Sequence, residues 1–93
     1  MSVYVSRGQR LAARKVAGEM VILSADDSSL FVLNEVGTSI WDAADGYRSI
    51  DDIVDGVCRE YDVDAGTARR DVETFVDALV AAGVLCTSDR AVG

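Results

Sequence analysis

The stretch LNEVGTSIWDAADG, residues 33–46, joins a predicted strand directly to a predicted helix. The run Leu30–Leu33 is apolar and rich in residues that favour strands. Asn34 is a favoured helix N-cap type, and Gly46 is suited to end a helix. Apolar residues recur between them at helical spacing: Val36, Ile40, Trp41 and Ala44. The stretch therefore predicts a strand that ends where a short helix begins.

Two further helices are predicted downstream. Ser49 and Asp52 have the spacing of a capping box, with Asp in place of the usual Glu or Gln. An amphipathic stripe follows: Ile50, Ile53, Val54, Val57, Cys58 and Tyr61. Asp64 can cap the last helix, and Gly83 suits the position just after its end. The apolar stripe of that helix is Ala68, Val72, Phe75, Val76 and Leu79.

The first half of the chain predicts strands. Short β-prone runs cover residues 14–16, 19–23 and 30–33, and the connections between them are short. We therefore expect an α+β fold in the order β-β-β-α-α-α, with a three-stranded antiparallel sheet covered on one face by the helices. The side chains expected to meet in the core are Phe31, Leu33, Trp41 and Phe75.

Length, charge and cysteine content limit the class of protein. The 93 residues suffice for one domain, which we expect to span residues 14–86. Residues 1–23 contain four basic residues and one acidic residue, Glu19, and so have a net charge of +3. Because the whole chain has a net charge of −7, residues 24–93 have a net charge of −10. We expect residues 1–13 to be a solvated basic arm, or else to contact an acidic partner, and residues 87–93 to be a flexible tail. No export signal or membrane span is predicted, which indicates a cytoplasmic protein with reduced cysteines.

The sequence offers few groups for catalysis. It has no histidine, which excludes the common triads and leaves no imidazole for acid–base chemistry near neutral pH. Cys58 and Cys86 have neither CxxC spacing nor histidine partners, so we expect no metal and no cofactor. The glycines form no phosphate-binding loop. These absences argue against a self-sufficient enzyme.

Several short motifs together resemble the coenzyme PQQ synthesis protein D (PqqD) family. The resemblance covers residues 14–86 and is carried by residues 33–37 (LNEVG), 40–41 (IW), 45–46 (DG), 50–54 (IDDIV), 60–63 (EYDV), 71–72 (DV) and 79–85 (LVAAGVL). Members devoted to PQQ itself commonly carry proline-containing segments before the first helix. This chain has no proline, so it is more similar to the pathway-diverse part of the family.

The resemblance implies a winged helix-turn-helix fold and a non-catalytic role. Family members bind the leader segment of a ribosomally made precursor peptide as an added strand and present it to a modifying enzyme, often a radical S-adenosylmethionine enzyme. Carried over by position, the strand that receives the guest is Ser29, Leu30, Phe31, Val32 and Leu33. The facing wall of the last helix is Arg69, Arg70, Glu73, Val76, Asp77 and Val80. Arg69 and Glu73 are equally expected to form a solvated i, i+4 pair.

Two other functions remain open at this stage. A DNA-binding regulator would share the winged fold, but both long helices carry more acidic than basic residues, and clustered positive charge is the usual signature of phosphate binding. A general protein-interaction module is the other alternative. An open edge strand also allows strand exchange between two copies, so we expect a monomer or a weak homodimer. Neither nucleic acid nor a membrane is an expected partner.

Overall fold

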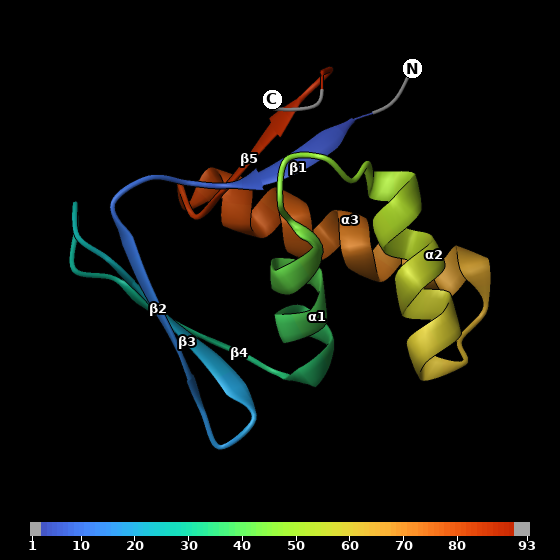
Figure 1. Ribbon diagram of the computed structural model, residues 1–93, viewed down its shortest axis with the longest axis horizontal. Helices are drawn as coiled ribbons and strands as arrows, with labels where there is room; N and C mark the ends of the chain where they lie inside the picture. Colours follow the sequence, from blue (N-terminus) through green and yellow to red (C-terminus); the bar gives the residue numbers. More distant parts are fainter. Residues whose placement is uncertain (1–2, 91–93) are drawn as a thin grey trace.

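Two small β-sheets and three helices make up the computed structural model, which describes residues 3–90 (Figure 1). The strands are β1 (Tyr4–Arg7), β2 (Leu11–Val16), β3 (Glu19–Ser24), β4 (Leu30–Leu33) and β5 (Leu85–Ser88). The helices are α1 (Glu35–Ala43), α2 (Ile50–Tyr61) and α3 (Ala65–Ala81). The predicted three-stranded sheet and three helices are confirmed, and β1 and β5 are additional strands.

Local side-chain contacts begin each helix where the sequence predicts. Asn34 accepts a hydrogen bond from the Gly37 backbone N–H at the start of α1. Ser49 and Asp52 form the reciprocal capping box of α2. The Asp64 carboxylate accepts from the Thr67 N–H at the start of α3. Each cap satisfies an N–H group that has no partner within its own helix.

The end of α3 also follows the prediction. Gly83 has a φ of 79°, a left-handed conformation that favours glycine. The Val84 N–H then donates to the Leu79 carbonyl, and both Val84 and Leu85 are buried. The reversal after α3 therefore returns the chain toward the core and into β5.

The larger sheet has the order β2-β3-β4, with both neighbouring pairs antiparallel. Alternation along the strands gives the sheet two faces. Ile22 and Leu33 point inward to the helices, and Lys15 on the same face lies 3.8 Å from Asp42 on α1. Leu23, Leu30 and Val32 point outward and are exposed. Helix α1 packs against the inner face at β3 and β4.

The core is one cluster of side chains from the inner face of this sheet, the three helices, and β1 and β5. Trp41 and Leu33 are buried as expected, whereas Phe31 and Phe75 are half-buried at its margin. The Arg7 guanidinium lies 4.9 Å from the centroid of the Trp41 ring and donates to the Trp41 carbonyl. The cation–π contact and these hydrogen bonds hold Arg7 against Trp41, one of the core residues of α1.

The structure differs from the sequence prediction at both ends of the chain. Residues 1–13 were expected to be a solvated arm, but Tyr4–Arg7 form β1, which pairs with β5 and has Val5 completely buried. The expected tail likewise includes the end of β5. The other side of β1 bonds to the α1–α2 connection, where the Gly46 N–H donates to the Val5 carbonyl. Of the expected arm and tail, residues 1–2 and 91–93 lie outside the described residues.

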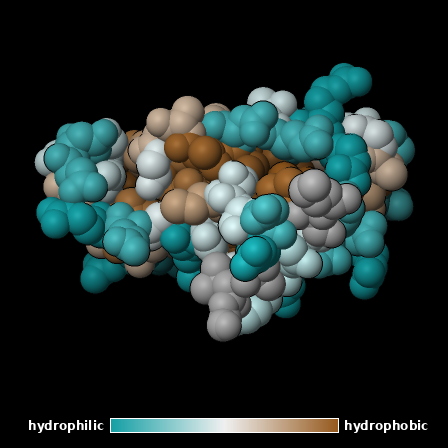
Figure 2. All heavy atoms as spheres, turned by 90° about the horizontal axis from the view of Figure 1, so that it is seen from above, coloured by the Kyte–Doolittle hydropathy of each residue, from teal (hydrophilic) through white to brown (hydrophobic). Residues whose placement is uncertain are grey.

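Seen from above, from the side where β1 and β5 lie, the molecule has a band of apolar surface along its middle, bordered by hydrophilic side chains (Figure 2). Among residues 3–90, no helix is both long enough and apolar enough to cross a membrane.

Candidate functional site

The open edge of β4 is the first part of the candidate site. The Ser24 N–H donates to the Ser29 carbonyl at 2.9 Å, which makes Ser24 and Ser29 a hydrogen-bonded pair. Such pairs alternate along antiparallel strands, so Phe31 and Leu33 direct their backbone polar groups toward β3. Leu30 and Val32 direct theirs away from β3. The β4 edge therefore presents unpaired backbone donors and acceptors to a further strand.

Thr38 on α1 contacts the last residue pair between β3 and β4, Met20 and Leu33. Its buried hydroxyl accepts from the Met20 N–H at 3.2 Å and donates to the Leu33 carbonyl at 3.3 Å. This side chain bridges the paired residues Met20 and Leu33 and so connects α1 to both strands. The sheet and α1 therefore hold a fixed relative position beside the open edge.

The two edges of the sheet differ in charge. The opposite edge strand, β2, carries Arg14 and Lys15, and charged side chains hinder pairing with another strand. The four residues of β4 carry no charge. Leu30 and Val32 on β4 are 63% and 57% exposed, so this edge also presents apolar side chains to solvent. Of these two edges, β4 is the one suited to accept a guest strand.

An apolar groove of about 460 Å³ lies between α1 and α3, next to the end of β4. Asn34, which follows the last residue of β4, stands at its border. Its lining residues are Asn34, Val36, Gly37 and Ile40 from α1, and Arg70, Asp71, Thr74, Phe75 and Ala78 from α3. Phe75 passes close to Gly37, where any Cβ atom would lie only 2.8 Å from the ring. The missing side chain of Gly37 therefore makes room for the Phe75 ring.

The structure divides the predicted α3 residues between several environments. Arg70 lines the groove. Arg69 instead bonds to Asp51 on α2 and lies 3.7 Å from Glu73, which confirms the predicted i, i+4 pair. The hydrogen bond that Arg69 donates to the Asp51 carboxylate, together with the negative charge of Asp51, raises the pKa of Arg69. Val76 is completely buried, Val80 is half-buried against the core and Asp77 is exposed.

Sequence reasoning missed most of the residues that line the groove. On α3 these are Asp71, Thr74, Phe75 and Ala78, and on α1 they are Val36, Gly37 and Ile40. Arg69 and Arg70 differ by about 100° around the helix, so neighbouring residues can face different elements. The available signal was Phe75, which lies at one margin of the apolar stripe. Its direction relative to β4 depends on how α3 packs.

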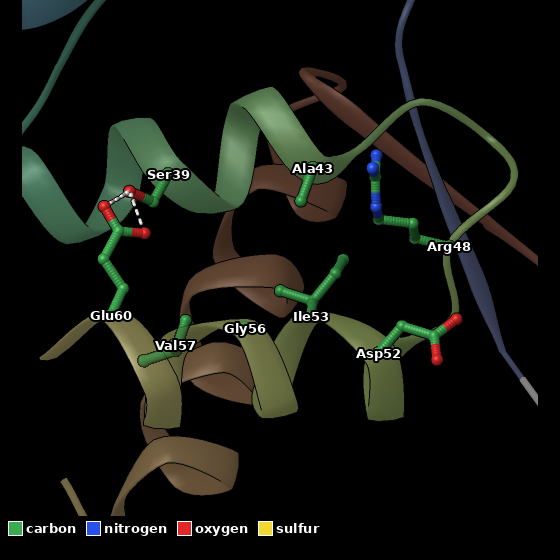
Figure 3. A pocket seen from close by; sticks show the side chains of 8 residues that line it. All are labelled: Ser39, Ala43, Arg48, Asp52, Ile53, Gly56, Val57 and Glu60. Atoms are coloured by element: carbon green, nitrogen blue, oxygen red, sulfur yellow. Dashed lines mark hydrogen bonds between the residues drawn. The ribbon is translucent and has the colours of Figure 1, made fainter. Parts of the chain in front are cut away.

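A second recess, of about 130 Å³, lies between α1 and α2 (Figure 3). Its polar side chains are already engaged. Ser39 donates to both carboxylate oxygens of Glu60 at 3.3 Å, Asp52 belongs to the α2 capping box, and Arg48 is paired with Asp45. The recess is small for a peptide, and these groups stabilise the fold. Among residues 3–90, no group of three potential metal-binding side chains occurs, and both cysteines are free.

An open, uncharged edge strand beside an apolar groove defines a small α+β domain suited to binding an extended peptide. The family model of coenzyme PQQ synthesis protein D (PqqD) matches residues 19–85, so the chain belongs to the PqqD family. The match begins at β3 and ends at the first residue of β5; β1 and β2 lie outside it.

Two solved structures resemble this chain closely in fold. One is TbiB1 in complex with the TbiA(beta) leader peptide, with 30% sequence identity and a TM-score of 0.80, covering 86% of this chain and 93% of that chain. The other is lasso peptide synthetase B1 complexed with the leader peptide, with 21% identity and a TM-score of 0.80, covering 88% and 96%. At 21% identity, this second structure supports the assignment of the fold alone. A search of curated proteins found no match.

Proposed function

We propose that this protein is a non-catalytic adaptor that binds the leader segment of a ribosomally made precursor peptide. The leader adds as a strand beside β4, and the adaptor presents the precursor to a modifying enzyme. The observation that carries this proposal is the outward direction of the backbone groups of Leu30 and Val32, next to the groove that Phe75 lines. The leader peptide bound to TbiB1, a 30% identical relative, supports the same class of guest.

An added strand would contact both parts of the site. Its backbone would bond to Leu30 and Val32 whatever its sequence, and its inward side chains would face the helices. The groove adds selectivity for apolar side chains, with Arg70 and Asp71 as polar groups at its border. Pairing of two β4 edges would occupy the same backbone groups, so a weak homodimer would compete with the leader.

The modifying enzyme supplies the chemistry in this proposal. The chain has no histidine, and the polar groups in the recess between α1 and α2 are bonded to one another or to neighbouring residues. Membership of the PqqD family favours a maturase, often of the radical S-adenosylmethionine type, as that enzyme. We place the encounter in the cytoplasm, where a ribosomal precursor is made. The DNA-binding alternative gains no support from the acidic helices or from the similar structures.

Replacing Val32 with proline tests the strand-addition step. Proline removes the outward N–H of Val32 but leaves the bonds between β4 and β3 in place. We expect the affinity for a labelled leader peptide that binds the parent protein to fall at least tenfold, which is ~1.4 kcal/mol. Fluorescence anisotropy measures the affinity, and thermal unfolding checks the fold.

Ala13→Pro is the matched control for Val32→Pro. Ala13 lies opposite Ile22 and directs its N–H away from β3 at the other edge of the sheet. This variant should cost similar stability and leave the leader affinity unchanged. Equal affinities for a folded Val32→Pro protein and the parent would show that the leader binds elsewhere.

A further inference from the structure

The outer face of the larger sheet is unusually apolar. Antiparallel sheets with one solvated face commonly alternate between apolar and polar residues. Here, six of the eight residues on the outer face are apolar: Ala12, Val16, Val21, Leu23, Leu30 and Val32, with Arg14 and Glu19 as the exceptions. No described helix packs on this face, and Leu23 is 44% exposed beside Leu30 at 63%. A contiguous exposed patch of this kind often marks a binding surface.

The patch continues to the open edge. Val21 lies opposite Val32, and Leu23 lies opposite Leu30, so two apolar rows cross from β3 to β4 and end there. A shallow hollow of about 400 Å³ over Ala12, Leu23 and Leu30 extends the patch toward β2. A strand added to β4 would place residues directly opposite Leu30 and Val32, with their side chains on the same outer face.

We infer that Leu30 and Val32 form a second recognition row that selects leader segments with apolar residues on the outer face of the guest strand. The inference rests on the proposed function and extends it. The inward side chains of the guest meet the groove between α1 and α3, while the alternate side chains lie beside Leu30 and Val32. The substrate class is therefore an extended segment with aliphatic or aromatic residues on both faces.

The guest strand is favoured over a face-to-face partner as the occupant of this row. Leu30 and Val32 are the two most exposed large apolar residues of the sheet, and each lacks a lateral neighbour on the open side of β4. An added strand supplies that neighbour at the spacing of a cross-strand pair, about 5 Å between Cβ atoms. The same strand also satisfies the outward backbone groups of Leu30 and Val32. A partner lying on top of the sheet would leave those groups unpaired.

A peptide selection tests the inference without knowledge of the natural leader. An mRNA-displayed library of random twelve-residue peptides is selected on the intact protein, and the bound pool is sequenced. We expect enrichment of apolar residues at consecutive positions, covering both faces of an extended strand. We also expect the pool to bind the double variant Leu30→Thr, Val32→Thr about fivefold more weakly than the parent. Thr keeps the backbone N–H and a high strand propensity, so the fold should be retained.

Two control variants separate this inference from the proposed function. Val16→Thr changes an outer-face residue on β2 that is 50% exposed, and it should leave the affinity of the pool unchanged. Phe75→Ala removes the inner contact in the groove. A pool that depends on Phe75 but binds the double variant as tightly as the parent would overturn the second row and leave the proposed function intact. A pool insensitive to Phe75→Ala, the double variant and Val32→Pro would overturn both.

Discussion

Gly37 determines how closely the Phe75 ring approaches α1. A Cβ atom at this position would meet the ring at 2.8 Å and the Asn34 side-chain oxygen at 3.2 Å. We expect Gly37→Ala to displace Phe75 and to weaken leader binding about tenfold, or ~1.4 kcal/mol. The higher helix propensity of Ala should offset part of the cost of this displacement in the folded state. Anisotropy titration with the leader peptide measures the effect on binding.

Gly56 on α2 provides the control for Gly37. A Cβ atom there meets nothing within 4 Å, so Gly56→Ala should stabilise the protein by about 0.5–1 kcal/mol and leave binding unchanged. If Gly37→Ala binds the leader as tightly as Gly56→Ala does, Phe75 makes no contact that the guest needs. The importance of Gly37 was not predictable from the sequence, because it depends on a residue 38 positions away.

Asp64 contributes a pH-dependent cap to α3. Hydrogen bonds from the Thr67 hydroxyl and then from its backbone N–H hold the pKa of Asp64 below its usual value. The folded pKa is lower than the unfolded value of about 3.9, so this stabilisation is complete above that pH and is lost as pH falls through the folded pKa. Asp64→Asn keeps a capping oxygen but does not titrate.

Thermal unfolding of both proteins between pH 7 and 2 tests this linkage. We expect the melting temperature of Asp64→Asn to fall less steeply in acid than that of the parent. Asp27 and Asp45 also have lowered pKa values, because their carboxylates accept hydrogen bonds from the backbone N–H groups of Ser29 and Tyr47. Both residues titrate in the parent and in the variant. Parallel curves for the two proteins would mean that Asp64 contributes nothing to acid sensitivity.

Helix α3 has two flanks with different contacts, although its stripe and caps were predicted correctly. Arg70 lines the groove, whereas Arg69 bonds to Asp51 on the other flank. We expect Arg70→Glu to weaken an acidic leader about fivefold at low salt, with a smaller effect as salt is added. Arg69→Glu should lower thermal stability slightly and leave binding unchanged. Titrations at two salt concentrations make the comparison, and equal losses for both variants would contradict this division of α3.

The helices and the central strands could be predicted because their signals are local. The caps at Asn34, Ser49 and Asp64 each involve residues within one turn. The pairing of β1 with β5 was not predictable in the same way, because Tyr4 and its partner Ser88 are 84 positions apart. Neither short strand alternates clearly enough to identify its partner. Loop closure between such distant segments depends on the packing of everything between them.

At the scale of the whole molecule, the net charge and the exposure of the basic side chains near the N-terminus agree with the sequence prediction, but the contacts of those side chains were not predicted. The basic residues near the N-terminus were expected to be solvated. In the structure Arg7 contacts Trp41, Arg10 pairs with Asp26 and Lys15 lies near Asp42. Each cation thus meets a group on a segment far along the chain or across a turn. The net charge is still −7, but Arg7 and Arg10 of the expected basic arm contact other parts of the folded domain.

The pairing of β1 with β5 brings both ends of the described chain to one side of the molecule, while β4 lies with the larger sheet on another (Figure 1). A polypeptide joined at either end therefore starts away from the guest strand. A flexible connection from there to an enzyme would raise the local concentration of a bound precursor at that enzyme without crossing the groove. The same fold is thus compatible with an enzyme fused at either terminus and with a separate enzyme to which the adaptor brings the precursor.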